Sequence, residues 1–368
     1  MKYKLITLLL ITCSLAFSAA NAQVFERSRE LTKTYKVYKE TTLEVSNKYG
    51  NIHLFPWEKD SIKIHIEVNV KANKESKADK IYEYIDFDFS NTKYYVVAKT
   101  AFRDNKNAFW SEVSDLASTL FSGNNKAQID YFIYLPSGME VSFENKFGNI
   151  YTTNHSGKMT VKLSNGDFKA NNIMGYANLD FKLGNVSIGQ INDGMLKVSY
   201  GEVDIEEANM LVVESKSSTL KIGKLNDLKL ESRRDKYYID RIKSISGATS
   251  FSYINIEDFS NDMNLETEYG EVNFDNVESS FQLISLSSKY TDITFNVSDG
   301  FKCVLNIDHS ESSGITYPES FTGLKMVEID KKEDHFKTSG TIGTNPKPAG
   351  KINIRLWSGN VVMKKNSH

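Results

Sequence analysis

The sequence predicts an all-β protein, a parallel β-solenoid built from coils of about 18 residues. Three observations predict it. Glycine recurs at a nearly constant interval, short runs of alternating apolar and polar residues flank each glycine, and the composition favours strands. Only 5 of the 368 residues are proline, whereas 19 are tyrosine and 21 are phenylalanine, and aromatic residues are enriched in β-structure.

The glycine repeat is clearest from Gly148 to Gly201, where the steps to Gly166, Gly184 and Gly201 are 18, 18 and 17 residues. A small polar residue and then an apolar residue follow each glycine. We expect these glycines at a corner where the backbone needs positive φ or approaches its neighbour closely. The Asn, Asp or Glu beside them can bond local backbone or stack along the corner. The predicted corner positions are Gly50, Gly148, Gly166, Gly184, Gly201, Gly270 and Gly359.

Each period holds two alternating runs, such as Val186 and Ile188 followed by Leu196 and Val198. Alternation buries one face of a strand, and a single coil cannot bury that face alone. Stacked coils can, which places Val186, Val203 and Leu220 in one row. The apolar spacing does not fit a hexapeptide β-helix, and the uniform period argues against the antiparallel hairpins of a β-sandwich.

Four segments are predicted. Residues 1–22 have the basic start, short apolar run and small-residue site of a secretory signal peptide. Cys13 follows Thr12 rather than the Gly, Ala or Ser of a lipobox, which argues against lipidation. Residues 23–140 form an N-terminal cap region, residues 141–317 the solenoid repeats, and residues 318–368 an irregular excursion with closing strands. No later apolar run is long enough for a transmembrane helix.

The cap region contains two predicted short helices. One covers residues 73–82 and places Ala78, Ile81, Tyr82 and Ile85 on one side. The other lies within residues 103–126, where Phe109, Val113, Leu116 and Leu120 form an apolar stripe. We expect them to cover an open end or edge of the stack. The second could instead dock a partner or a membrane surface.

Charge and cysteine content exclude several classes. The formal net charge is -2, and it becomes about -4 if the signal peptide with Lys2 and Lys4 is removed, which is too mild a balance to predict nucleic-acid binding. Cys303 is then the one remaining cysteine, so no internal disulfide is expected. The histidines show no metal-ligand spacing, and no phosphate-binding loop or nucleophile elbow is present, so we expect no cofactor, metal or catalytic motif.

Two groups of side chains remain as candidates. Glu202 and Asp204 lie two apart on a strand and could form a carboxylate pair of a glycosidase, with further outward charges at Glu206, Arg233, Arg234, Asp240 and Arg241. Such mixed charges more often form a solvated face. The second group is a row of corner tyrosines, which pack successive coils or present a flat binding strip. These are Tyr200, Tyr237, Tyr253, Tyr269 and Tyr290.

The assembled features resemble the DUF4097 "putative adhesin" family of β-strand repeat proteins, which is related to the head-domain "putative" autotransporter adhesins. The resemblance rests on residues 43–52, the turn at residues 57–60, the strand at residues 130–136 and the repeated Gly-Asn-Ile/Val units, and it extends from about Thr41 to Val362. It implies a right-handed solenoid exported by a Bacteroidetes-type bacterium, and it implies no catalytic residues.

The sequence therefore favours an exported, non-enzymatic scaffold, an adhesin or envelope-binding protein, that binds an envelope protein or a glycan along its side. We expect it in the periplasm or at the cell surface. Two alternatives stay open, a β-helix polysaccharide lyase or hydrolase and a periplasmic sensor or regulator. The oligomeric state and the ligand are not specified by these patterns.

Overall fold

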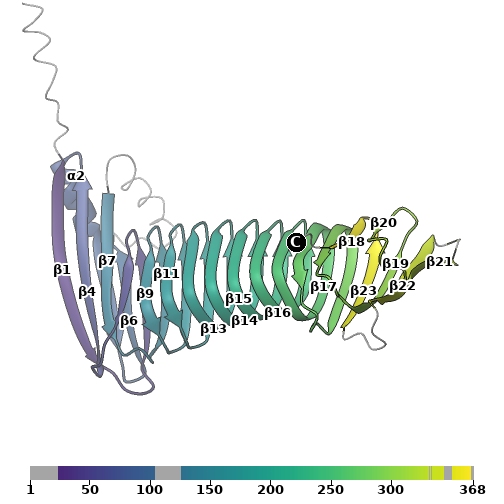
Figure 1. The fold of residues 1–368 in the computed structure, drawn as a ribbon. Coiled ribbons are helices and arrows are strands. Elements are labelled where there is room, and N and C mark those ends of the chain that lie inside the picture. Colours follow the sequence, from purple (N-terminus) through teal and green to yellow (C-terminus); the bar gives the residue numbers. More distant parts are fainter. Residues whose placement is uncertain (1–23, 104–125, 331, 333, 344–349, 366–368) are drawn as a thin grey trace, which may run out of the picture.

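The computed structural model describes residues 24–103, 126–330, 332, 334–343 and 350–365. The predicted signal peptide and the predicted helix at residues 103–126 lie outside these residues, apart from the single positions at the edges of the second. The described chain is mainly β, and its strands form one long, largely parallel sheet stacked along a single axis (Figure 1).

The stack has two faces, defined by position relative to the corner glycines. The first face consists of the strands that follow each corner, β3 (Ile52–Pro56), β9 (Ile150–His155), β11 (Phe168–Ile173) and the first halves of β13 (Asn185–Ser199), β14 (Glu202–Lys216), β15 (Thr219–Arg233) and β16 (Lys236–Ser250). The second face consists of β2 (Thr42–Lys48), β8 (Glu140–Lys146), β10 (Met159–Ser164), β12 (Ala177–Lys182) and the second halves of the longer strands. Strands β17 (Tyr253–Val277) and β18 (Leu283–Val297) continue both faces.

The register matches the repeat in the sequence. Phe168 pairs with Val186 at an offset of 18 residues, and Val186 pairs with Val203 at an offset of 17. Val203 in turn pairs with Leu220, which confirms the predicted row. All of these side chains are buried. Each contributes roughly 1.5–3 kcal/mol by leaving water, so the shared interior is what holds successive coils together.

The N-terminal end departs from the expected parallel order. β1 (Phe25–Lys36) pairs antiparallel with β4 (Ser61–Ala72), β4 with β7 (Lys126–Leu135), and β5 (Ile85–Asn91) with β6 (Tyr95–Phe102). The coil that contains Gly50 lies directly against the coil that contains Gly148, since Leu43 pairs with Val141. The end predicted only as a cap region with first strands and two short helices therefore contains antiparallel pairings. Long-range pairing brings the two coils together across a sequence separation that local patterns do not encode.

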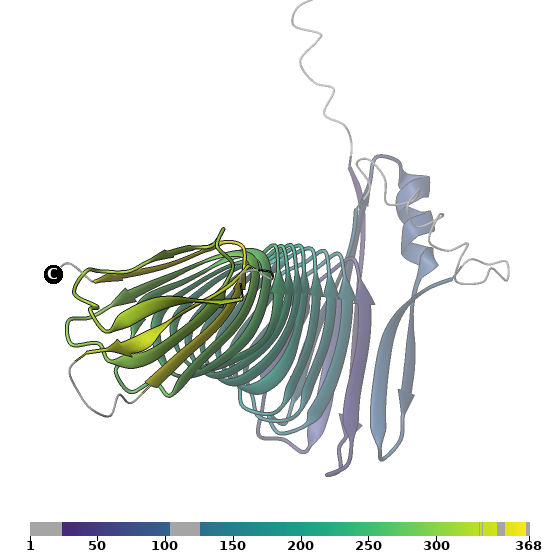
Figure 2. The same cartoon turned by 90° about the vertical axis from the view of Figure 1, so that its right-hand side faces the viewer.

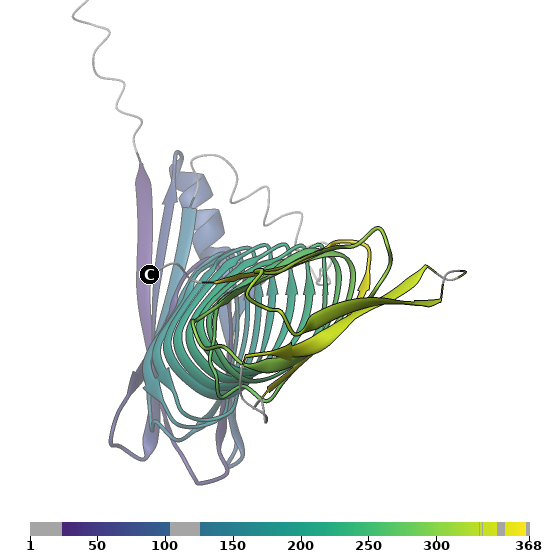
Figure 3. The same ribbon diagram turned by 45° about the vertical axis from the view of Figure 1, so that its right-hand side comes forward.

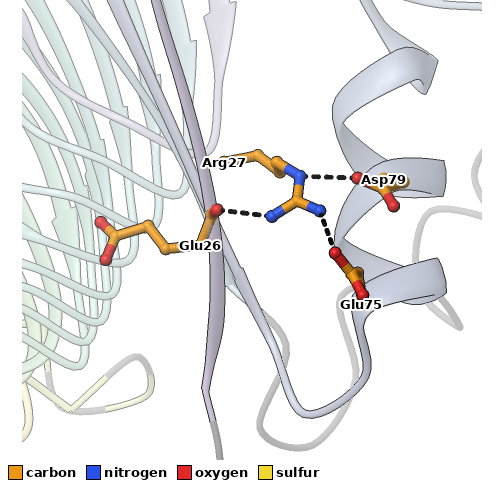
Figure 4. A network of polar contacts seen from close by, with 4 residues as sticks. All are labelled: Glu26, Arg27, Glu75 and Asp79. Carbon is orange, nitrogen blue, oxygen red and sulfur yellow. Dashed lines mark hydrogen bonds and ion pairs between the residues drawn. The ribbon is translucent and has the colours of Figure 1, made fainter.

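The first predicted helix is present as α2 (Glu75–Tyr84). It buries Ala78, Ile81 and Tyr84 and lies outside the strands at the N-terminal end (Figure 2). Arg27 on β1 attaches the helix, because its guanidinium donates to Asp79 at 2.6 Å and to Glu75 at 2.9 Å (Figure 4). β1 is an edge strand, and it carries charged side chains such as Arg27. Charged side chains on an edge strand discourage pairing with other chains.

At the C-terminal end, the last two strands of the chain insert between strands that come earlier in the sequence. β23 (Gly350–Trp357) and β24 (Asn360–Lys365) pair with β18 on one side. On their other side lie β19 (Cys303–His309) and β20 (Gly314–Thr316), which come earlier in the chain. The predicted excursion contains an ordered antiparallel hairpin, β21 (Leu324–Asp330) and β22 (His335–Ile342), which extends from the end of the stack (Figure 3, yellow-green).

Within the described part of the chain, no helix is long and apolar enough to span a membrane. Cys303 is a free thiol buried on β19, and burial raises its pKa to about 12. This thiol is held in its protonated, unreactive form.

Candidate functional site

The corner glycines are required by close approach of neighbouring coils. A Cβ atom at any of the seven predicted positions would lie 1.9–2.4 Å from a carbonyl oxygen of the adjacent coil. The alternative explanation, positive φ at the glycine, is wrong for all of them except Gly359, where φ is 116°. Positive φ belongs instead to the residue directly before the glycine, or before the residue that takes the place of the glycine in other coils. We call this residue the corner residue.

The corner residues adopt the left-handed conformation in coil after coil, with φ between 49° and 68°. A bulky side chain in this region carries backbone strain on the order of 1–3 kcal/mol, which the surrounding pairing must offset. Several of them are half-exposed apolar side chains. The corner residues are Tyr49, Phe147, Asn165, Leu183, Tyr200, Ser217, Arg234, Phe251, Tyr269, Tyr290 and Ser358.

The polar residue after the glycine forms a ladder along the corner. Asn149 N–H donates to Asn51 Oδ1 at 2.9 Å, Asp167 N–H to Asn149 Oδ1 at 2.8 Å, and Asn185 N–H to Asp167 Oδ1 at 2.9 Å. Each side chain thus satisfies a backbone donor of the next coil. This is the stacking that the sequence predicted for these residues, and it fixes the corner geometry on which the aromatic side chains sit.

The predicted tyrosine strip divides into three environments. Tyr200, Tyr269 and Tyr290 are exposed corner residues. Tyr253 lies on the first face, where its ring contacts Tyr238 with centroids 5.7 Å apart.

Tyr237 does not belong to the strip. It is fully buried, takes the inward position next to Leu220, and its hydroxyl lies 2.6 Å from Ser215 Oγ. Burial raises the pKa of Tyr237. The register explains why the sequence analysis wrongly placed Tyr237 in the strip. Asp235 occupies the glycine position of this coil, so Tyr237 lies two residues after that position and faces the core.

A continuous aromatic stack lies at the C-terminal part of the corner. Phe251 and Tyr269 stack with ring centroids 5.0 Å apart, and Tyr269 and Tyr290 with centroids 4.9 Å apart. All three are 44–55% exposed. The guanidinium of Arg234 lies 5.9 Å from the Phe251 centroid. Phe251 was missed at the sequence level because only tyrosines were aligned, although it directly precedes Ser252, which replaces the glycine.

A shallow trough of about 680 Å³ runs along the second face beside this stack. Its rim is continuous with the stack, since Ser250, Glu268 and Lys289 directly precede Phe251, Tyr269 and Tyr290. Acids, amines, a guanidinium and hydroxyls alternate along it, as expected of a surface that hydrogen-bonds a polar polymer. The outward polar lining residues are Asp180, Lys197, Ser199, Glu214, Lys216, Glu231, Arg233, Ser250, Glu266, Glu268, Ser287 and Lys289.

Charge pairing in the trough is partial. Lys197 Nζ lies 2.7 Å from Glu214 Oε2, and this hydrogen bond raises the pKa of Lys197. Farther along the same row, Ala248 separates Glu231 from Glu266. The small side chain of Ala248 leaves space between these two carboxylates.

The structure does not bring the candidate catalytic carboxylates, Glu202 and Asp204, together with all of the outward charged residues that the sequence grouped with them. Glu202 and Asp204 share the first face, and Glu202 Oε1 forms an ion pair with Lys221 Nζ at 2.6 Å, which raises the pKa of Lys221. Asp204 lines a separate depression with Glu206, Asp240 and Arg241. Arg233 faces the trough on the second face, and Arg234 is a corner residue. No group of three or more potential metal ligands occurs among the described residues.

No protein-family model and no curated protein matches the chain. Similar solved structures include a "putative cell adhesion protein" from Clostridium sporogenes, with 12% identity, coverage of 92% of this chain and 100% of that one, and a TM-score of 0.21. A "putative adhesin" from Parabacteroides distasonis has 11% identity, coverage of 73% and 97%, and a TM-score of 0.35. Another from Bacteroides fragilis has 14% identity, coverage of 73% and 97%, and a TM-score of 0.28. The chain is thus distantly similar to solved structures described as adhesins.

Proposed function

We propose that the protein is an exported, non-enzymatic adhesin-like scaffold, a right-handed β-solenoid that binds an extended glycan along its second face. The observation that supports this function best is the exposed stack of Phe251, Tyr269 and Tyr290 on the rim of the trough. Aromatic edges offer apolar contact to sugar rings, and the phenol and trough groups offer hydrogen bonds to hydroxyls.

The geometry suits a long ligand better than a small one. The trough is open and crosses many coils, so binding sums weak contacts along a rigid surface instead of enclosing one molecule. The rigid backbone keeps these groups in place before binding, which lowers the entropic cost of association.

The test is binding of the purified protein to a panel of neutral and acidic polysaccharides by titration calorimetry. We expect the triple variant Phe251→Ala, Tyr269→Ala, Tyr290→Ala to lose at least roughly tenfold in affinity, about 1.4 kcal/mol. The matched control is Tyr94→Ala with Tyr176→Ala, two exposed tyrosines away from the stack, and it should bind like the wild type. Equal affinity of the triple variant, or no polysaccharide binding by the wild type, would contradict the proposal.

The same mixtures test the enzymatic alternative. Glu231 and Glu266 lie two strand spacings apart, about 9.6 Å between backbones, which is near the carboxylate separation of inverting glycosidases. We expect no new reducing ends or unsaturated products during prolonged incubation. Product formation that Glu231→Gln abolishes would establish the hydrolase or lyase function instead.

Location is tested separately by fractionation of the native cells and by protease treatment of intact cells. An adhesin is expected to be exported and accessible to the protease at the cell surface. Full protection together with recovery in the periplasm would favour the sensor or regulator.

A further inference from the structure

Another hollow lies at the C-terminal end of the stack, between β19, β22 and β23. It measures about 530 Å³ and is lined by Asp308, His309, Ser310, Asp334, His335, Arg355, Leu356 and Trp357. It continues the trough, because Ser287 pairs with Arg355 and Lys289 pairs with Trp357. A polymer that follows the trough toward the C-terminal end therefore reaches this hollow.

Trp357 supplies an aromatic platform here. Its side chain is 57% exposed, and no ring contact to it occurs among the described residues. This distinguishes it from Tyr269, both of whose faces are covered by its neighbours in the stack. A free indole face can pack flat against the apolar face of a pyranose ring, which a ring inside a stack cannot do.

Arg355 lies two residues before Trp357 on β23, so both side chains project from the same side of the strand about 7 Å apart. In the part of the chain that the structure describes, no carboxylate lies within ion-pair distance of its guanidinium. A guanidinium that is free to bind presents a planar fork of donors, which matches a carboxylate with two parallel hydrogen bonds.

The acids that line the hollow have other partners. Asp308 Oδ1 lies 3.4 Å from His335 Nε2, although Asp308 is the residue paired with Arg355 across the strands. Asp334 Oδ1 accepts the backbone N–H of Glu311 at 2.9 Å. His309 is buried and contacts Thr338 Oγ1 at 3.0 Å and the Ser310 carbonyl oxygen at 2.9 Å, so it supports the wall of the hollow. Arg355 is left as the cationic group available to a ligand.

We infer that the hollow binds an acidic sugar residue, with the pyranose ring on Trp357 and the ring carboxylate on Arg355. The inference deepens the proposed function, because it assigns the chemical class of one residue of the glycan. A neutral sugar would use the platform and leave the guanidinium without its counter-charge, so the hollow selects for acidic sugars at one end of the trough.

The probes are trigalacturonic acid and neutral galactotriose, titrated into the purified protein by calorimetry at low ionic strength. We expect the acidic trisaccharide to bind at least roughly tenfold more tightly than the neutral one. Arg355→Gln should remove that preference while neutral binding is retained, and Arg355→Lys should restore only part of it because an ammonium lacks the fork. Trp357→Ala should weaken both ligands. The matched control is Lys351→Gln, an exposed cation on the same strand, which should leave both affinities unchanged.

The outcomes separate this inference from the proposed function. If long polysaccharides bind, the Phe251, Tyr269 and Tyr290 triple variant loses them, and Arg355→Gln and Trp357→Ala bind acidic trisaccharide like the wild type, the hollow is not the acidic-sugar site and the function stands. If trigalacturonic acid binds and Arg355→Gln weakens it while the triple variant retains polysaccharide binding, the hollow is confirmed and the stack has no role in binding. Equal affinity of the wild type for the two trisaccharides would overturn the inference.

Discussion

The same corner is built with two different chemistries in two regions of the stack. In the coils of Gly166, Gly184 and Gly201, a glycine stands at the position of closest approach, and the inward row beside these glycines is apolar, with Leu163, Phe181 and Val198. In the later coils the glycine is replaced by Ser218, Asp235 and Ser252. The inward row becomes polar at the same point, with Ser215, Ser232 and Thr249 in register with Val198.

Asp235 organises the later region. Its buried carboxylate accepts hydrogen bonds from Ser215 Oγ at 2.6 Å, Ser232 Oγ at 2.7 Å, Ser218 N–H at 2.7 Å and Arg233 N–H at 2.9 Å. The earlier region also buries an ionisable side chain, His155, whose Nε2 has no hydrogen-bond partner among the described residues. His155 lies in an otherwise apolar row beside Ile173 and Ile191. A corner can therefore hold either a glycine, which has no side chain, or a polar side chain whose hydrogen bonds are all made. The two kinds of corner should respond differently to substitution.

The largest effect is expected from Gly184→Ala. The new Cβ would lie 1.9 Å from the Gly166 carbonyl oxygen, which belongs to rigid backbone, so neighbouring coils must separate. We expect a loss of more than about 4 kcal/mol in the free energy of unfolding, or failure to fold. The measurement is chemical denaturation followed by circular dichroism.

A graded series keeps this prediction testable if Gly184→Ala does not fold. A Cβ at Gly189 would lie 2.7 Å from a carbonyl oxygen, and one at Gly138 would lie 3.7 Å from the Ser156 hydroxyl oxygen. The destabilisation should decrease in the order Gly184, Gly189, Gly138, with Gly138→Ala near neutral. A different order would show that clearance between coils does not determine the corner glycines.

An intermediate effect is expected from Asp235→Ala. The substitution leaves one buried and one partly buried backbone N–H group and two serine hydroxyls without their shared acceptor, and each unsatisfied buried donor costs about 1–3 kcal/mol. Because the hydroxyls can turn to other acceptors, we expect a total loss of about 2–4 kcal/mol in the free energy of unfolding. The exposed Asp204→Asn is the control and should change stability by less than about 0.5 kcal/mol. A near-neutral Asp235→Ala would show that the polar row is held by the serine and threonine residues alone.

This contrast also shows what the sequence could predict. The repeat period and the buried rows of side chains could be predicted, because they follow from the local alternation of apolar and polar residues around Val186 and Val203. The tyrosine at 237 was misplaced because the repeat was aligned by residue type. Aligned by position, Asp235 falls under Gly201 and Gly184, and Phe251 falls under Tyr200.

The two ends of the stack could not be predicted in the same way. Leu43 pairs with Val141, and Ile284 pairs with Ile352 after the chain has formed β19 to β22. These partners are chosen by long-range packing, and nothing in their own segments specifies the register. The hollow around Arg355 and Trp357 was missed for this reason, since it exists only because β23 inserts between β18 and β19.

The smallest effect is expected from acid, and it concerns the earlier region. Burial among apolar side chains lowers the pKa of His155 to about 4 from its ordinary value of 6.5, opposed by backbone hydrogen bonds at Met139 and Lys158. The neutral form is thus favoured in the folded state. The contribution of the neutral imidazole to the free energy of unfolding is fully present above about pH 6.5. This contribution is lost as the pH falls from 6.5 toward 4, by about 2 kcal/mol at pH 5.

His155→Leu should remove this part of the acid sensitivity, because leucine matches the apolar row and takes up no proton. The measurement is the free energy of unfolding between pH 7.5 and pH 4.5, compared with the wild type and with Ile173→Leu, which alters packing in the same row but keeps His155. Parallel curves for His155→Leu and the wild type would show that His155 is not the acid-sensitive group. In that case, burial of an imidazole in this apolar row would not be what makes the earlier coils sensitive to acid.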